Sequence, residues 1–262
     1  MKIHLIAGLT SLVIGLAACG GSARDEESPA EYSVSARQNY EKGMAKLEEE
    51  EWGDAAKFFS FVKARFPYSK FAVLAELRLS DALFGAEAYL EAVDGYKLFI
   101  KFHPTHDMVT SGYAAFRIGE AYYKMLPDDW FMVPPSFEKD PSATRDAERE
   151  LATFIAKYPG SPYIAKGKKM HEACAKLLAA HEWYVAKFYW ERDKPMGTVL
   201  RLRTLIGEYS GTGYDPEALF LLGQAYIRVK RPGDAKTVLQ RLVRDYPNHA
   251  RAADARSTLT HL

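Results

Sequence analysis

Residues 218–247 read ALFLLGQAYIRVKRPGDAKTVLQRLVRDYP and contain two apolar patterns of helical period. Within each pattern, apolar or small residues recur every three or four positions, which places them on one face of a helix. These residues are Leu219, Leu222, Gly223, Tyr226, Ala235, Leu239 and Leu242. Pro247 ends the second helix, because proline has no N–H group and clashes with the preceding turn. The stretch therefore predicts two antiparallel helices that approach closely where small residues face each other.

The same spacing recurs along the chain. In four segments an alanine stands 12 residues before a proline, and an apolar or aromatic residue follows the alanine by four positions. The four sets are Ala55, Phe59 and Pro67; Ala92, Tyr96 and Pro104; Ala147, Leu151 and Pro159; and Ala235, Leu239 and Pro247. A weaker fifth copy has Thr198, Leu202 and Ser210. In four of the five copies, a small residue also precedes the first position by 12, namely Gly43, Ser80, Ala186 and Gly223.

These segments resemble tetratricopeptide repeats, in which each repeat is a pair of antiparallel helices. About five repeats cover residues 36 to 250, and a short polar helix follows them. This number exceeds the roughly three stacked units that a repeat protein needs for stability. We therefore predict an all-α tetratricopeptide-repeat superhelix of about five helix pairs with a C-terminal capping helix. Ser69 and Ser161, each two residues after a repeat proline, are placed to cap the helices that follow.

The N-terminus carries the pattern of an exported protein. Lys2 and His4 precede an apolar run of 14 residues, which is shorter than the roughly 20 residues that span a bilayer. The run ends in Leu16, Ala17, Ala18 and Cys19, which resembles a bacterial lipobox. We expect residues 1–18 to be a signal peptide, Cys19 to be lipidated, and residues 19–34 to form a flexible tether. An ordinary signal peptide with a nearby cysteine is the alternative. Gly20 after the cysteine is typical of lipoproteins sorted to the outer membrane.

The net charge of +1 conceals an asymmetry between the two halves of the chain. Residues 19–159 hold 17 Lys and Arg against 24 Asp and Glu, a net charge of −7, whereas residues 160–262 hold 17 against 10, a net charge of +7. An exported protein rarely meets nucleic acid, so we expect no nucleic-acid partner. The basic half favours an acidic protein surface. The alternative is that these charges only solvate helix faces.

The third repeat contains an insertion. Gly119 and Ala147 are 28 residues apart, where 12 are usual, and the inserted loop covers residues 127–142. It holds Trp130, Phe131 and Phe137 among several prolines, and a loop of this length is usually functional or disordered. The alternative is that its rings fold back as a lid on the repeat core. With this loop, residues 35–159 form repeats 1–3, and residues 160–262 form repeats 4 and 5 and the cap.

The sequence lacks the motifs of a catalytic site. The His-Glu dipeptides at His171 and His181 have no second histidine four residues later, so they are not zinc-protease helices. His171 and Cys174 are too few ligands for a metal site. A phosphate loop and a Gly-x-Ser-x-Gly elbow are also absent. We therefore expect no enzymatic activity, no metal and no cofactor, and we expect a scaffold that binds proteins.

A particular family is indicated by residues 179–189, which read AAHEWYVAKFY. They resemble the pattern Ala-x-His-Glu-x-x-Val-Ala-x-x-Tyr of the BamD family of β-barrel assembly lipoproteins. Further matches are residues 65–69, 99–104 and 157–163. The resemblance implies an outer-membrane lipid anchor on the periplasmic face and a role in handing unfolded outer-membrane proteins to the assembly machinery. Two alternatives remain. One is another periplasmic repeat lipoprotein, such as a pilus pilotin or cell-division coordinator. The other is an enzyme whose helices support a catalytic domain, as in lytic transglycosylases, but the repeats leave no residues to form such a domain.

The resemblance also implies sites. In the family, C-terminal repeats dock on the periplasmic domains of the barrel subunit BamA through an arginine that matches Arg201 here. The Tyr-Pro turn after that arginine is changed to Tyr209 and Ser210. The helix that contains residues 179–189 has large side chains at helical spacing, which predict its core stripe: His181, Tyr184, Val185, Phe188 and Tyr189. Trp183 and Trp190 lie on a second face of the helix, so we expect this face to pack against the insert or a partner.

The resemblance also implies that the N-terminal repeats receive segments of unfolded outer-membrane proteins. Their groove would be lined by aromatic residues that the repeat pattern does not use, which are Tyr40, Phe61, Phe71, Tyr89, Tyr113 and Phe116. The alternative for these rings is that they fill gaps between repeats.

Overall fold

The computed structural model describes residues 32–126 and 140–262. Within these ranges the chain forms helices and no strand. In chain order they are α1 (Ala36–Glu48), α2 (Trp52–Arg65), α3 (Lys70–Gly85), α4 (Tyr89–Phe102), α5 (Asp107–Thr110), α6 (Tyr113–Lys124), α7 (Ser142–Lys157), α8 (Ile164–Glu191), α9 (Pro195–Glu208), α10 (Asp215–Arg228), α11 (Pro232–Asp245) and α12 (Ala250–Leu259). The signal peptide, Cys19, most of the tether, and Trp130, Phe131 and Phe137 of the insert lie outside the described residues.

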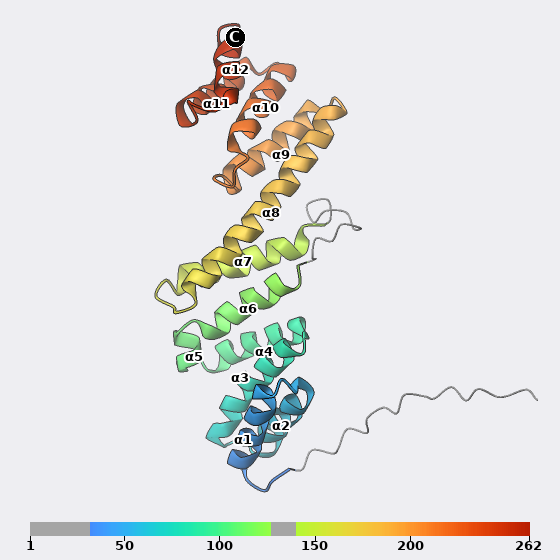
Figure 1. Cartoon of the computed structure of the whole chain (residues 1–262), viewed down its shortest axis with the longest axis vertical. Coiled ribbons are helices and arrows are strands. Elements are labelled where there is room, and N and C mark those ends of the chain that lie inside the picture. The colour runs from blue at the N-terminus through green and yellow to red at the C-terminus, as the bar shows by residue number, and fades with distance from the viewer. Residues whose placement is uncertain (1–31, 127–139) are drawn as a thin grey trace, which may run out of the picture. The chain divides into compact units, whose positions relative to one another are not determined.

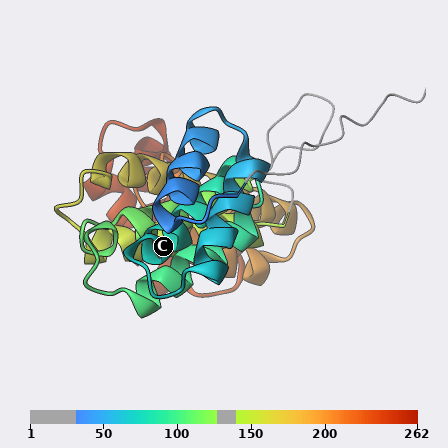
Figure 2. The same ribbon diagram turned by 90° about the horizontal axis from the view of Figure 1, so that it is seen from below.

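The helices pack as successive pairs, each on its neighbours in the chain (Figure 1). The pairs are α1 with α2, α3 with α4, α6 with α7, α8 with α9, and α10 with α11, and α12 covers the last pair. Helices of different pairs point in different directions when the described part is seen along the stack (Figure 2). This arrangement confirms the predicted all-α superhelix of five pairs with a capping helix.

Small residues set the distance within each pair. A Cβ atom added to Gly43, Gly119 or Gly223 would lie 2.6–2.8 Å from Phe59, Leu151 or Leu239 on the paired helix, closer than real contacts allow. In the second pair the roles are exchanged, because Gly95 of α4 contacts Ser80 of α3. The alanines at the repeat positions and the large residues four positions later are 0% exposed. The spacing found in the sequence is therefore the spacing of the helix crossings.

The turns between helices also repeat. Inside four of the pairs, one residue adopts a left-handed conformation with φ between 51° and 60°: Glu50, Glu87, Asp193 and Lys230. Between pairs, each second helix that precedes a repeat proline ends two residues before it. The residue two positions after that proline accepts a hydrogen bond from a backbone N–H at the start of the next helix or turn. These residues are Ser69, His106, Ser161 and His249.

The prediction for Ser69 is confirmed, since its hydroxyl caps α3. Ser161 is not the N-cap of α8, because that helix begins only at Ile164. Its hydroxyl instead accepts the N–H of Tyr163 in the turn that leads into the helix. His106 had no role in the sequence analysis, and the structure gives it one, since its Nδ1 caps the short helix α5.

We predict that Gly223→Ala lowers the free energy of unfolding. Alanine normally stabilises a helix over glycine by about 1 kcal/mol, but the new methyl group would lie 2.6 Å from the fully buried Leu239. Overpacking of this kind costs about 1–3 kcal/mol. Urea unfolding followed by circular dichroism measures the difference. Gly207→Ala is the matched control, because no atom lies within 4 Å of its Cβ position, and it should leave stability unchanged or higher.

Candidate partner-binding site

Helix α8 is shared by two pairs. Its 28 residues correspond to a length of about 42 Å at 1.5 Å per residue. The first half packs on α7, where Cys174 joins the buried cluster of Ala147 and Leu151. The second half packs on α9, where Ala186 joins the core of the last two pairs. The predicted candidate residues of the C-terminal half therefore all lie on or beside α8.

A buried carboxylate lies at the junction between these halves. Glu182 is 2% exposed and accepts from Arg201 of α9 at 3.3 Å. Arg145 of α7 lies 3.5 Å from the same carboxylate. A buried charge is tolerated only when it is paired. Arg145 of α7 and Arg201 of α9 therefore compensate the charge of Glu182 from the two helices that pack on α8. Arg201 thus has an internal partner, while its side chain remains 39% exposed.

The stripe expected to form the core face of α8 is not buried. His181, Tyr184, Val185 and Tyr189 are half-buried, and Phe188 is 41% exposed. The buried face instead holds Leu178, Ala179, Glu182 and Ala186. The expectation was wrong because it placed the largest aromatic side chains in the core. Helix α8 packs on both α7 and α9, and close helix crossings require small residues at the points of contact.

Trp183 and Trp190 pack against the core of the C-terminal pairs. Trp183 lies 6.1 Å from Tyr214, and the Arg228 guanidinium of α10 lies 3.7 Å from the Trp190 ring, a cation–π contact. The second aromatic face of α8 therefore exists as predicted, but the chain's own α10 and the turn before it cover much of it. These rings chiefly stabilise the fourth and fifth pairs.

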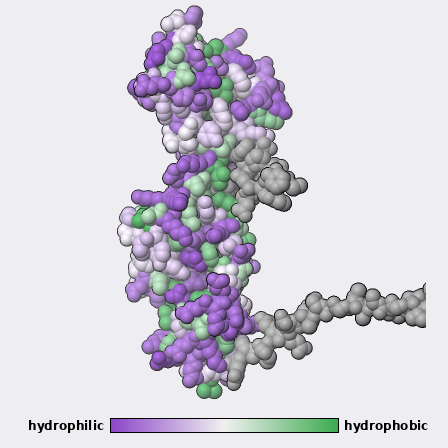
Figure 3. Space-filling model, viewed as in Figure 1, coloured by the Kyte–Doolittle hydropathy of each residue, from purple (hydrophilic) through white to green (hydrophobic). Residues whose placement is uncertain are grey.

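The solvent-facing ridge of α9 offers apolar surface beside Arg201. Met196 is 52% exposed and Leu200 is 58% exposed, and Arg203 continues the same face one turn later. On the face shown in Figure 3, the described part of the chain is mostly hydrophilic, with small hydrophobic patches. Exposed apolar side chains next to a charged residue that is fixed in place are typical of the centre of a protein interface.

The six aromatic candidates of the N-terminal groove contact the chain itself. Tyr40 and Phe71 lie 5.6 Å apart in the cluster of the first pairs, Phe61 stacks on Tyr32 at 4.1 Å, and Tyr89 meets Phe84 edge-on. Phe116 is 2% exposed between Phe154 and Tyr163. Its assignment to the groove is wrong, because a buried ring between repeats is out of reach of a ligand. The other five rings are partly exposed.

Tyr113 belongs to a buried polar network that the sequence analysis missed. Its hydroxyl and that of Tyr96 donate to Asp81 at 2.8 and 2.6 Å. Arg117 donates to the Tyr96 hydroxyl and to Glu120. Burial, and then the Asp81 carboxylate, raise the pKa of Tyr113, so its phenol stays protonated as a donor. The network joins α3, α4 and α6. Aspartate, arginine and tyrosine at helical positions are common on surfaces, so no sequence signal distinguished these.

The remaining candidate chemistry is structural. His171 Nε2 lies 2.9 Å from Glu148, and Cys174 is fully buried. Burial, and then the nearby Glu148 carboxylate, raise the pKa of the Cys174 thiol to about 12, so it is protonated and unreactive at neutral pH. Among the residues that the structure describes, no group of three or more metal-ligating side chains occurs. Nor does any described helix have the length and apolar character needed to cross a membrane.

Comparison with known proteins relates this geometry to a family. The sequence model of the YfiO family, described as an outer membrane lipoprotein, matches residues 33–233, which run from just before α1 into the first turn of α11. The chain belongs to this family. The BamD outer membrane protein assembly factor of Neisseria gonorrhoeae is 25% identical over 88% of each chain. That of Rickettsia prowazekii is 26% identical over 90% of each. A solved complex of the TPR2AB domain of yeast Sti1 covers 86% of this chain and 82% of its own, with 12% identity and a TM-score of 0.41.

The YfiO family match includes the turn where this sequence departs from the expected Tyr-Pro. Ser210 donates to the Asp215 carboxylate at 2.5 Å, and the N–H of Gly211 donates to its other oxygen at 2.8 Å. Asp215 is 1% exposed. A buried aspartate therefore orders the turn without proline. Helix α9 ends at Glu208, two residues before Ser210, just as the other second helices of this YfiO member end two residues before their repeat proline.

We predict that Glu182→Gln destabilises the protein, because Arg145 and Arg201 then face a neutral, buried amide. Charge-assisted hydrogen bonds contribute about 1.5–3 kcal/mol, so the free energy of unfolding should fall by about that amount. Glu172→Gln, on the exposed side of the same helix and paired only with Lys176, should cause no measurable change. Equal stability of the two variants in urea unfolding would show that the junction is unimportant.

Proposed function

We propose that this protein is a scaffold of the outer-membrane β-barrel assembly machinery, anchored to the periplasmic face of the outer membrane. The observation that carries the proposal is the family match over residues 33–233, together with relatives named as assembly factors along nearly their whole length. Those names describe assembly and not a catalysed reaction, which supports a binding role. The family match also argues against a pilus pilotin, a cell-division coordinator or a transglycosylase.

The C-terminal repeats dock on the periplasmic domains of a BamA-like barrel subunit. Three features of the described residues support this. The half from residue 160 onward has a net charge of +7, Met196 and Leu200 are exposed on α9, and Arg201, the residue after Leu200, donates to the buried Glu182. An acidic partner side chain would share the exposed edge of Arg201, while its apolar neighbours pack on the ridge.

The N-terminal repeats receive extended segments of unfolded outer-membrane proteins. The rings that remain partly exposed contribute only their exposed edges, since each also packs within the fold: Tyr40, Phe61, Phe71, Tyr89 and Tyr113. Unfolded segments lose much freedom on binding, and shallow contacts of this kind favour the weak, reversible capture that a transfer step needs.

We predict that Leu200→Asp and Arg201→Ala each weaken binding to the purified periplasmic domains of the barrel subunit by at least about tenfold. Leu200 is exposed and has no role in the core, so its variant tests binding apart from folding. Arg251→Ala on α12 is the control. Like Arg201, Arg251 is an arginine with a solvent-accessible side chain and a carboxylate partner, which in this case is Asp254. Calorimetric titration measures the affinity of each variant for the barrel subunit. If all three variants bound with the same affinity, α9 would not be part of the interface.

We propose that Cys19 is the lipid-anchoring residue, on the strength of the lipobox-like sequence before it. Cys19→Ser should leave a folded protein in the soluble periplasmic fraction when the barrel subunit is depleted, because no described helix can hold it in a membrane. Fractionation and immunoblotting measure the distribution. Recovery of the variant in membranes under that depletion would contradict the assignment.

A further inference from the structure

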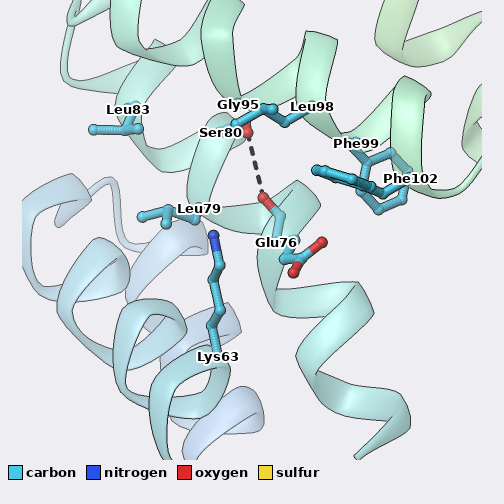
Figure 4. Close-up of a pocket in the computed structure, with 9 residues that line it drawn as sticks. All are labelled: Lys63, Glu76, Leu79, Ser80, Leu83, Gly95, Leu98, Phe99 and Phe102. Carbon is cyan, nitrogen blue, oxygen red and sulfur yellow. Dashed lines mark hydrogen bonds between the residues drawn. The ribbon is translucent and has the colours of Figure 1, made fainter. Parts of the chain in front are cut away.

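The second helices of the first three pairs, α2, α4 and α7, form a face with two neighbouring grooves. The first groove lies between α2 and α4 over α3, and its volume is about 230 Å³. Leu79 and Leu83 of α3 and Leu98, Phe99 and Phe102 of α4 line it (Figure 4). The second groove lies between α4 and α7 over α6, with a volume of about 140 Å³ and a lining that includes Ile100 and Phe154. Helix α4 separates the two grooves.

The size of these grooves indicates what they can hold. Small-molecule and cofactor sites usually measure about 300–1,000 Å³, and both grooves are smaller than this. Each has room for a large apolar side chain or two, and both are open to solvent along α4. They are therefore suited to anchoring side chains of a peptide.

The ridge of α4 between the grooves is unusually apolar for an exposed surface. Leu98 is 50% exposed and Phe102 is 63% exposed, one helical turn apart. Both belong to the wall of the first groove, together with Phe99, which is only 1% exposed (Figure 4). Exposed apolar side chains beside a hollow mark an interaction site more specifically than single exposed residues do.

Lys63 lines the first groove, Lys157 lines the second, and Lys101 lies on the helix between them. Lys63 on α2, Lys101 on α4 and Lys157 on α7 all lie in the last turn of their helices and are exposed. In the described part of the chain none of the three forms an ion pair. The two carboxylates in the grooves already have partners, since Glu76 lies 2.8 Å from His103 and Glu150 lies 3.5 Å from Lys97. The C-terminal ends of these three helices are therefore locally basic, although Glu91 and Asp94 are exposed nearer the start of α4 and the N-terminal half has a net charge of −7.

We propose that this second-helix face binds an extended, acidic segment of a partner protein that places one large apolar side chain in each groove. In an extended chain, residues four apart point to the same side and are about 13 Å apart. That distance matches the about 10–12 Å diameter of the helix that they must straddle. Aspartate or glutamate residues beside the anchors then pair with Lys63, Lys101 and Lys157.

The site is separate from the docking surface proposed on α9, because no residue is shared between them. An extended protein segment fits better than a membrane surface, because a lipid bilayer would contact the lysines but has no side chains to enter two separate hollows. The binding therefore requires both the acidic charges and the apolar pair.

The probe is the fluorescently labelled peptide Glu-Asp-Leu-Ser-Gly-Ser-Phe-Asp-Glu, capped at both ends, titrated against the full chain by anisotropy. We expect micromolar binding that weakens at high salt. The Lys63→Glu, Lys101→Glu and Lys157→Glu triple variant and the Phe102→Asp variant should each bind about tenfold more weakly. Leu90→Asp is the matched control and should bind normally, since Leu90 is also exposed on α4, at 54%, but lines neither groove.

Three results would overturn the proposal. One is equal or stronger binding of a peptide in which lysine replaces every acidic residue. Another is an equal loss of affinity in Leu90→Asp and Phe102→Asp. The third is the absence of peptide binding, with or without binding of the full chain to phosphatidylglycerol vesicles. Because the α9 surface is intact in all these variants, their affinity for the barrel subunit should not change, so failure here is distinguishable from failure of the proposed function.

Discussion

The carboxylate of Glu182 lies in the second half of α8, with Arg145 of α7 and Arg201 of α9 beside it. Transfer of a lone carboxylate into the core is costly, so α8 can be continuous and buried here only because both neighbours supply a cation. Repeat proteins otherwise couple each unit to the next through apolar contacts. The ionic contact joins the third and fourth pairs through one side chain, and it fixes Arg201 beside the exposed ridge of α9.

The fold was largely predictable from the sequence, because its determinants are local. Gly223 and Leu239, or Gly119 and Leu151, meet at helix crossings whose spacing is the same in each repeat. The spacing of small residue, large residue and proline therefore predicts the pairs, their order and the ends of the second helices. Even the copy without proline kept its register, because Asp215 orders the turn in its place.

The site was less predictable, because it depends on which face of each helix meets which neighbour. Periodicity identified two aromatic faces on α8 but not that Glu182 and Ala186 form the buried one. Trp183 and Trp190 were expected to pack against the insert or a partner, and α10 and the turn before it cover much of both rings. Phe116 was assigned to a groove and lies between repeats. Arg201 was found only through a family resemblance, and its pairing with Glu182 across 19 positions has no signal in a single sequence.

We infer that α8 holds the third and fourth pairs together as one cooperative unit, and native-state hydrogen exchange tests this inference most directly. The amides of α8 on both sides of Glu182 should exchange with the same free energy, equal to that of global unfolding, because neither pair can open without disturbing the shared helix. A lower free energy at residues near Glu182 than in either flank of α8, with the flanks exchanging independently, would contradict the account.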